Sequence, residues 1–406
     1  MRIQMLRPLL GLVIAGSAMA QDWIIPAGTT VVYDTANGRV AVDQLIIEQG
    51  AILRIVGSQP FGVTARAGVL IDGSLDMSGT SSAGVTGLNS TNLPELGASG
   101  MAGGGSGGVG SAMTSQSTPS GGAGFGSLMA PNSGGSGGET GYGLGTRDNR
   151  RGAGGGGGAL AADAPVHANP DDPSNQGRIA EGGRNGTPTG LGAVSQLVLP
   201  QGGAQGTSVF TDGIANNDFW GMKLEPGIGL IMGELSFPVA GQGGGAGGDA
   251  VRSATFPLMP FTTYGDEKGS GGGGGSGLAF ILTRQFVLGS GGNIMANGGE
   301  GGGGENTVFF DRVGGGSGGG SGGYLIIESY SFDLSAASDG ALRALGGKGG
   351  EGRNNLFDDI GGGGNGGPGV IQLHTLDGTA NAIQLPAGKT LADLSWPTAH
   401  VLMPNF

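Results

Sequence analysis

The stretch GGGSGGGSGGYLIIESYSF, residues 314–332, joins a glycine-rich run directly to a strand-like segment. Its first half has the composition of a flexible linker. Its second half is rich in the apolar and aromatic residues that are typical of β-strands. The run is therefore either a flexible tether or a piece of ordered structure. The answer decides whether the chain is a string of small units or one continuous fold.

The same arrangement recurs at a constant interval along the chain. The strand-like segments LAFIL (278–282), YLIIE (324–328) and VIQLH (370–374) begin 46 residues apart, and each follows a glycine-rich run. Between them, GGEGGGGENTVFFDRVGGG (298–316) parallels GGKGGEGRNNLFDDIGGGG (346–364). Each excursion has a glycine arm leading out, a non-glycine tip and a glycine arm leading back. Because a linker has no reason to repeat its length and sequence, these repeats favour ordered arms.

Ordered glycine needs a compensating interaction, because glycine loses more conformational freedom on folding than any other residue. Extended polyproline II rods without side chains can pack together and satisfy each other's backbone N–H and C=O groups. A third excursion, with arms at 241–248 and 269–277 and a tip at 249–268, has arms long enough for this. An arm of eight residues would reach roughly 25 Å. We therefore expect packed rods, with flexible loops as the alternative.

The N-terminal strands indicate how the rest of the chain is organised. IIPAG (24–28), IIEQG (46–50) and VLIDG (69–73) end on glycines that are 22 and 23 residues apart. A repeat near 20 residues is typical of a parallel β-helix, in which each coil buries its face against the next. An immunoglobulin-like sandwich would instead need hairpins with Asn-Gly or Asp-Gly turns, and Asp72-Gly73 is the one such pair among these strands. We predict an all-β fold, a right-handed parallel β-helix with polyglycine II-like, glycine-rich excursions.

The first twenty residues have the pattern of a secretory signal peptide. Arg2 and Arg7 precede the apolar segment LLGLVIAG (9–16), and Ala18-Met19-Ala20 forms a cleavage site. The apolar segment is far shorter than the roughly 20 residues that a membrane span needs. We therefore expect an exported protein that is extracellular or at the cell surface, with the periplasm as the alternative. The predicted divisions are the signal peptide (1–20), N-terminal β-helix coils (21–80), an irregular glycine-rich region with interspersed strands (81–240), and glycine-arm and strand repeats with a C-terminal coil (241–406).

Composition excludes several classes of function. The net charge is −12, and removing Arg2 and Arg7 would leave 17 basic and 31 acidic residues, a net charge of −14. Such acidity argues against nucleic-acid partners, whose phosphates need clusters of Lys and Arg. The chain has no cysteine, which excludes disulfides, a thiol nucleophile and cysteine zinc sites. No later apolar run is long enough for a transmembrane segment.

The repeated modules carry a resemblance. GGGGSGLAFILT (272–283), GGGSGGYLIIES (318–329) and GGGGNGGPGVIQLHT (361–375) resemble modules of uncharacterised exported bacterial glycine-rich repeat proteins. In those proteins the strand is followed by a pattern like G-x-I-x-A-x-G-G, here Gly292 to Gly299 and Gly340 to Gly347. The resemblance implies a secreted or surface protein and brings no activity with it.

A looser likeness is to phage receptor-binding adhesins, whose tips contain stacked polyglycine rods capped by variable recognition loops. The signal peptide departs from that pattern, because phage structural proteins are not exported in this way. This likeness therefore implies an architecture and no particular residues.

The sequence offers little that would hold a cofactor. LPAGKT (385–390) ends like a phosphate-binding loop, but Ile383 stands where the motif requires its first glycine. The three histidines, His167, His374 and His400, have no metal-ligand spacing. His374 ends a strand and is interpreted as a side chain at the edge of a rung. We expect no metal and no cofactor.

Two groups of charged tip residues have the chemistry of an acid and a base. Asp358 and Asp359 beside Phe357, or Asp311 beside Arg312, would suit a polysaccharide lyase or hydrolase. Adjacent carboxylates on a tip are more often a solvated turn, and a catalytic site needs a rigid supporting shell that glycine-rich surroundings supply poorly. We expect no enzymatic activity, with polysaccharide cleavage as the weaker alternative.

The excursion tips are the predicted binding site. Asn, Asp and Arg hydrogen-bond sugar hydroxyls, aromatic faces pack on sugar rings, and loops on a repeat scaffold are where binding usually occurs. Alternatively, Phe309 and Phe357 stabilise the turns by packing against neighbouring tips. We predict a non-enzymatic surface or matrix protein that binds a glycan or another cell surface, with a self-assembling structural protein as the alternative. The candidate residues are Asn306, Phe309, Phe310, Asp311, Arg312, Arg353, Asn354, Asn355, Phe357, Asp358 and Asp359.

Overall fold

The computed structural model describes most of the chain after the predicted signal peptide. Residues 1–20 lie outside the described residues. Within the described part, no helix has the length and apolar character needed to cross a membrane. The described residues are 21–85, 94–110, 121–127, 134–139, 141–143, 150–161, 168–169, 172–176, 180–186, 200–252, 268–305, 312–352 and 361–404.

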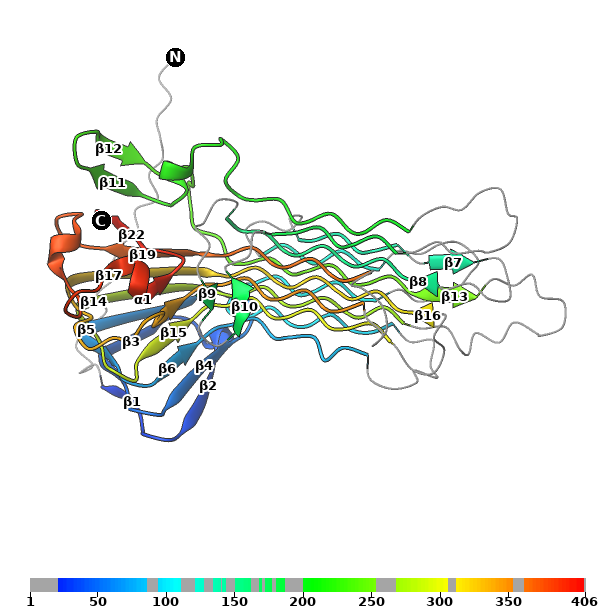
Figure 1. Cartoon of the computed structure of the whole chain (residues 1–406). Helices are drawn as coiled ribbons and strands as arrows, with labels where there is room; N and C mark the ends of the chain where they lie inside the picture. The colour runs from blue at the N-terminus through cyan, green and yellow to red at the C-terminus, as the bar shows by residue number, and fades with distance from the viewer. Residues whose placement is uncertain are drawn as a thin grey trace, which may run out of the picture.

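The strands of the body form two parallel sheets, one of eight strands and one of six (Figure 1). The chain visits the two sheets alternately, so that consecutive strands rarely pair with each other. The eight-stranded sheet, called the large sheet, contains β1 (Trp23–Ile25), β3 (Val40–Ile47), β5 (Phe61–Ile71), β14 (Leu278–Leu288), β17 (Tyr324–Asp333), β19 (Val370–His374) and β22 (His400–Leu402) in that order, with β20 (Ile383–Gln384) beside β17. The small sheet contains β2 (Thr30–Asp34), β4 (Ile52–Val56), β6 (Ser74–Asp76), β15 (Asn293–Met295), β18 (Leu342–Arg343) and β21 (Ser395–Trp396).

The prediction of a right-handed parallel β-helix is wrong. The strands lie in two separate parallel sheets and do not form a closed coil. A closed β-helix needs a short connection from each coil to the next. Here the chain leaves both sheets after β6, returns only at β14, and leaves them again after β15 and after β18. The spacing of 22 and 23 residues arose because the N-terminal strands alternate between the two sheets, a pattern that imitates the repeat of a coil.

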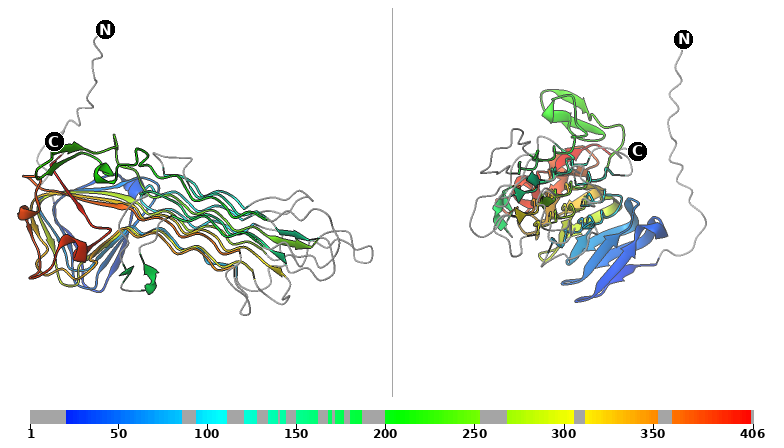
Figure 2. Two further views of the ribbon diagram at one scale, coloured as in Figure 1. Left: turned by 45° about the horizontal axis from the view of Figure 1, so that its top comes forward. Right: turned by 90° about the vertical axis from the view of Figure 1, so that its right-hand side faces the viewer.

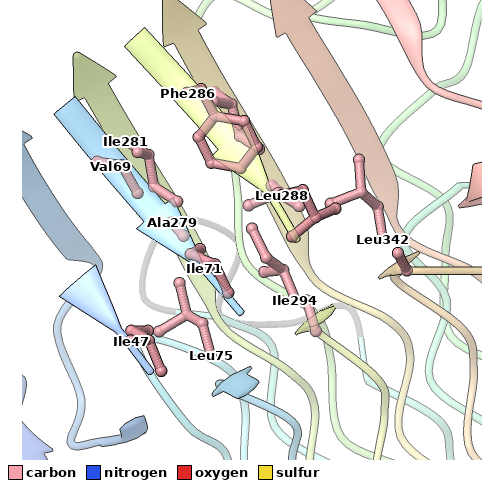
Figure 3. Packing of buried hydrophobic residues seen from close by; sticks show 14 of the residues in the cluster. Ile47, Val69, Ile71, Leu75, Ala279, Ile281, Phe286, Leu288, Ile294 and Leu342 are labelled. Carbon is pink, nitrogen blue, oxygen red and sulfur yellow. The ribbon is translucent and has the colours of Figure 1, made fainter. Parts of the chain in front are cut away.

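The hydrophobic core lies between the two sheets. Alternate residues of each strand face it, as in β14, where Ala279 and Ile281 are buried before a shift in register, and Phe286 and Leu288 are buried after it. Figure 3 shows the side chains of the large sheet, including Ile71, meeting those of the small sheet, including Ile294. Each fully buried Ile or Leu contributes about 2 kcal/mol. This core therefore holds the body together and anchors the excursions that leave it.

The glycine-rich segments run side by side away from the body and form an elongated bundle (Figures 1 and 2). Four short strands lie at its far end, where β7 pairs with β13 and β8 pairs with β16, both in parallel. The four strands are β7 (Gly141–Gly143), β8 (Arg150–Arg151), β13 (Ala250–Arg252) and β16 (Arg312–Val313).

Hydrogen bonds in the bundle follow a period of three residues, as the run 314–323 shows. The Gly315 and Gly318 N–H groups donate to the carbonyls of Gly248 and Gly245, each at 2.8 Å. The residues between them donate to two other neighbours in turn. A rod with three residues per turn presents its backbone groups in this way. The three acceptor segments are 242–248, 296–305 and 361–367, and the three segments that donate to the carbonyls of the run are 155–158, 270–276 and 347–350.

Close packing explains why the arms consist of glycine. A Cβ atom on Gly318 would overlap the carbonyl oxygen of Gly156, and one on Gly320 would overlap that of Gly274. A buried serine in an arm needs partners for its hydroxyl, and Ser317 finds them. Ser317 is fully buried, donates from Oγ to the Gly271 carbonyl at 2.6 Å and accepts from the Gly302 N–H at 2.8 Å. The run 314–323 is thus one rod of an ordered bundle.

Residues 207–240, called the insert, cover the outer face of the large sheet beside β22 (Figure 1). The backbone of Trp220 binds the insert to the sheet. Its backbone N–H donates to the Tyr324 hydroxyl at 2.9 Å, and its backbone carbonyl accepts from Gln372 Nε2 at 2.8 Å. The insert contains η2 (Ala215–Asn217) and an antiparallel hairpin of β11 (Met222–Glu225) and β12 (Gly229–Met232). The remaining elements are η1 (Thr35–Asn37), the antiparallel pair β9 (Ala168–Asn169) and β10 (Asp172–Gln176), η3 (Ala380–Ala382) and α1 (Leu391–Leu394).

Candidate functional site

The predicted tip residues fall almost entirely outside the described part of the chain. Arg312 is the exception, and only its backbone position is described: it lies in β16, in register with Arg150 of β8. The structure therefore neither brings the predicted tip residues together nor separates them. The candidates outside the described residues are Asn306, Phe309, Phe310, Asp311, Arg353, Asn354, Asn355, Phe357, Asp358 and Asp359.

A buried ionic cluster holds the bases of two tips together at the far end of the bundle. The Lys268 ammonium lies 3.2 Å from the Asp249 carboxylate, and their side chains are 3% and 0% exposed. The Lys268 N–H donates to Glu305 Oε2 at 2.9 Å, and its carbonyl accepts from the Glu305 N–H at 2.8 Å. We call Asp249, Lys268 and Glu305 the distal clamp. Buried charges are tolerated when hydrogen bonds satisfy them, so the clamp fixes where the tips at 249–268 and 306–311 begin.

A cavity of about 360 Å³ lies where the insert meets the large sheet and the roots of the rods. Its polar groups come from two sides: Asp218 and Lys223 from the insert, and Thr398 and His400 from the segment that leads into β22. Its size is at the lower end of the range of small-molecule sites, about 300–1,000 Å³. The residues that complete its walls are Ala161, Ala215, Gly369, Val370, Pro397, Ala399 and Val401.

Two charged side chains, Asp218 and Lys223, line this cavity. Asp218 is 9% exposed and contributes a carboxylate, while Lys223 contributes an ammonium group that lies 2.6 Å from Glu225. Burial, together with the smaller effect of the neighbouring charge of Lys223, lowers the pKa of His400 to about 4. His400 is therefore neutral at pH 7, with its ring 5.5 Å from that of Phe219. A neutral imidazole offers one hydrogen-bond donor and one acceptor.

Polar side chains continue beneath the insert on the neighbouring strand β19. Gln372 is in register with His400, is fully buried, and its Oε1 has no hydrogen-bond partner among the described residues. His374 is also fully buried, under the Trp220 ring at 6.0 Å, and both of its ring nitrogens lack a described partner. Burial lowers the pKa of His374 to about 4; the Met403 backbone opposes this shift without reaching hydrogen-bonding geometry.

The complete burial of His374 differs from the prediction that its side chain lies at the edge of a rung. The alternation of Gln372 and His374 in VIQLH marks a polar face on this strand, and that signal was present in the sequence. The sequence did not indicate which residue covers this face. The covering residue, Trp220, lies 152 positions before Gln372 in the chain.

The insert also contains an acidic cluster. Asp212, Asp218 and Glu234 each place one carboxylate oxygen within 4.8 Å of the others. Carboxylate oxygens in such a group are ligands that Ca²⁺ accepts. Hydrogen bonds from the insert already engage two of the three, since Asp212 accepts from the Asn217 amide at 2.8 Å and Glu234 accepts from the Thr211 N–H at 2.8 Å. These bonds account for only part of the cluster, because Glu234 Oε2 is buried without a hydrogen-bond partner among the described residues.

Comparison of the chain with family models, curated proteins and solved structures found no match. We therefore infer its function from its own geometry and chemistry.

Proposed function

We propose that this protein is an exported, non-enzymatic surface or matrix protein that binds a glycan or another cell surface through the tips of its glycine excursions. The observation that carries this proposal is the three-residue hydrogen-bond period of the rods. Each rod is tied to several neighbours along its whole length, as Gly315 and Gly318 are to 242–248. Such a bundle supports the tips at a distance from the body and resists bending.

The division of residue types supports recognition at the tips. The rods consist almost wholly of glycine with a few serines and alanines, and their buried backbone groups are already bonded to each other. Side chains able to recognise a ligand, such as Asn306, Phe309 and Arg353, are found where two arms meet. The distal clamp fixes the bases of two tips, and a fixed base lowers the entropy that a tip loses on binding.

Binding of residues 21–406 to a glycan array and to intact cells tests this proposal. The tip variant replaces Phe309, Phe310, Arg312, Phe357 and Asp358 with Ser. The control variant carries Tyr330→Ser and Leu376→Ser, which remove side chains that are 55% and 58% exposed on the body. Binding that is lost in the tip variant and kept in the control supports the proposal. Binding that the tip variant retains, or no binding by the parent chain, contradicts it.

One observation favours the self-assembling alternative. Among the described residues, the outer edges of β1 and β2 pair with no strand, and Ile24 and Val32 on them are 47% and 61% exposed. Open edges with apolar side chains promote pairing with another chain. At the opposite edge of the large sheet, beyond β22, the insert covers the strand edge, because the Met403 N–H donates to the Met222 carbonyl of the insert at 2.9 Å. An apparent molar mass from light scattering that rises with concentration in the parent chain and not in Val32→Lys would support assembly. A parent chain that stays monomeric at every concentration would exclude it.

A further inference from the structure

We propose that the acidic cluster of the insert, Asp212, Asp218 and Glu234, binds one Ca²⁺ ion. Each of these residues places a carboxylate oxygen within 4.8 Å of the others. The site lies apart from the excursion tips and rests on different observations from the proposed function. No local motif predicts it, because Glu234 lies 23 positions after Thr211 in the chain and only the fold brings it beside Asp212.

Two buried oxygen atoms at the acidic cluster have no partner. Glu234 Oε2 and Asn217 Oδ1 are both buried without a hydrogen-bond partner among the described residues. The Asn217 side-chain amide donates to Asp212 Oδ2 at 2.8 Å, so its oxygen, on the same carbon, also lies beside the cluster. The Glu234 N–H donates to the Asn217 carbonyl at 2.9 Å and holds the two residues together. Native structures rarely leave such acceptors unsatisfied, and a cation satisfies both.

The charges of the acidic cluster also favour a cation. Three carboxylates lie together, and that of Asp218 belongs to a residue that is only 9% exposed. Like charges repel each other more strongly when they are withdrawn from water. The Lys223 ammonium, which lines the cavity beside Asp218, lies 2.6 Å from Glu225 and is therefore shared with a further carboxylate. A divalent ion offsets most of this negative charge.

The donor atoms favour Ca²⁺ among the divalent ions. Every candidate ligand is an oxygen atom, from the three carboxylates and the Asn217 amide. Oxygen ligands suit hard cations, whereas Zn²⁺ and Cu²⁺ are usually bound through nitrogen or sulfur. Ca²⁺ accepts about six to eight oxygen ligands in flexible geometry, while Mg²⁺ needs a near-ideal octahedron and gives up its water reluctantly. Because Asp212 is exposed, water completes the coordination shell from that side.

The position of the acidic cluster gives the ion a structural role. Asp212 and Asp218 precede the hairpin of β11 and β12, and Glu234 follows it, so the ion joins the segments that enter and leave the hairpin. Trp220, whose backbone binds the insert to the large sheet, is two residues after Asp218. Bound Ca²⁺ therefore stabilises the insert on the sheet.

Calorimetric titration of metal-free residues 21–406 with Ca²⁺ tests the proposal, with Mg²⁺ as the comparison. Asp212→Asn removes an exposed carboxylate, and Glu234→Gln removes a charge while keeping an acceptor for the Thr211 N–H. Glu225→Gln is the matched control, because it makes the same change in the insert outside the acidic cluster. Hydrogen exchange of the insert with and without Ca²⁺ is the second readout, and circular dichroism verifies that each variant is folded.

We expect saturable Ca²⁺ binding with a Kd of about 10⁻⁴–10⁻³ M, the range of extracellular modules, and slower exchange in the insert when Ca²⁺ is present. Affinity should fall at least about tenfold in Asp212→Asn and Glu234→Gln and stay unchanged in Glu225→Gln. If Glu234→Gln fails to fold, Asp212→Asn decides alone. The proposal is overturned if no saturable binding occurs up to about 10 mM Ca²⁺, if Mg²⁺ binds as tightly, or if Asp212→Asn binds Ca²⁺ like the parent chain.

Discussion

Replacing Gly318 with alanine tests whether the rods are packed as closely as the hydrogen bonds indicate. The added methyl group would overlap the carbonyl oxygen of Gly156. That carbonyl accepts from the Gly245 N–H at 2.8 Å, and the Gly245 carbonyl accepts from the Gly318 N–H at 2.8 Å. The rods must separate to admit the methyl group, and both bonds are then lost.

The magnitude of this effect follows from two opposing terms. Two buried hydrogen bonds left unmade cost about 1–3 kcal/mol each. Alanine restricts the unfolded chain and recovers about 0.4–1 kcal/mol. We therefore expect Gly318→Ala to lower the free energy of unfolding by roughly 1–5 kcal/mol, measured by urea denaturation.

Gly182→Ala is the matched control for this experiment. Gly182 belongs to the same bundle but is exposed, and a Cβ atom there would come no closer than 3.3 Å, to the Gly203 carbonyl oxygen. We expect this variant to change the free energy of unfolding by less than about 1 kcal/mol. Equal stability of the two variants would refute the close packing of the rods.

Three further perturbations test other parts of the structure. Burial lowers the pKa of His374 from 6.5 to about 4, so its contribution is fully present above pH 6.5 and is lost as the pH falls through 4. The free energy of unfolding, measured by urea denaturation, should decline by up to about 3 kcal/mol as the pH falls over that range. His374→Phe should reduce this pH dependence, and an unchanged pH dependence would contradict the assignment. Lys268→Met leaves the Asp249 carboxylate buried without its cation and should lower the free energy of unfolding by about 3–5 kcal/mol in thermal unfolding. The double variant with Asp249→Leu should recover much of this loss. A double variant no more stable than Lys268→Met would show that the distal clamp is not the cause. Ser317→Ala removes the hydroxyl that accepts from the Gly302 N–H and should cost about 2 kcal/mol, with faster hydrogen exchange at that amide; unchanged exchange there would exclude the role assigned to the serine.

The repeats in the sequence predict the strand register well. LAFIL, YLIIE and VIQLH begin 46 residues apart, and in the large sheet Leu278 pairs with Tyr324, which pairs with Val370. Identical spacing produces this result because each excursion leaves the sheet and returns to the equivalent position on the next strand. The glycine content of the arms is explained in the same way, since close neighbours exclude side chains.

The arrangement of the body could not be predicted in the same way. A glycine after each short strand marks a turn and does not say whether the next strand joins the same sheet or another one. Ile47 and Leu53 look alike in the sequence, yet they belong to β3 of the large sheet and β4 of the small sheet. Alternation between two sheets therefore imitated the repeat of a β-helix.

No local pattern in the sequence predicted the cavity beside the insert. Its walls come from segments around positions 161, 215–223, 369–370 and 397–401, which only the folded chain brings together. Periodicity identifies a buried face but does not identify what covers it. The predicted tip residues had the opposite character, since their polar and aromatic types stand out from the surrounding glycines in the sequence.

Hydrogen–deuterium exchange along residues 314–323 tests the central claim, the ordered rod bundle, most directly. The structure places the N–H groups of Gly315, Gly318 and Ser321 in hydrogen bonds to 242–248. We predict that these amides exchange far more slowly than those of a free glycine-serine peptide and almost as slowly as those of the adjoining strand β17. Exchange at the rate of the free peptide would mean that the run is a flexible tether, and the rod bundle would then be wrong.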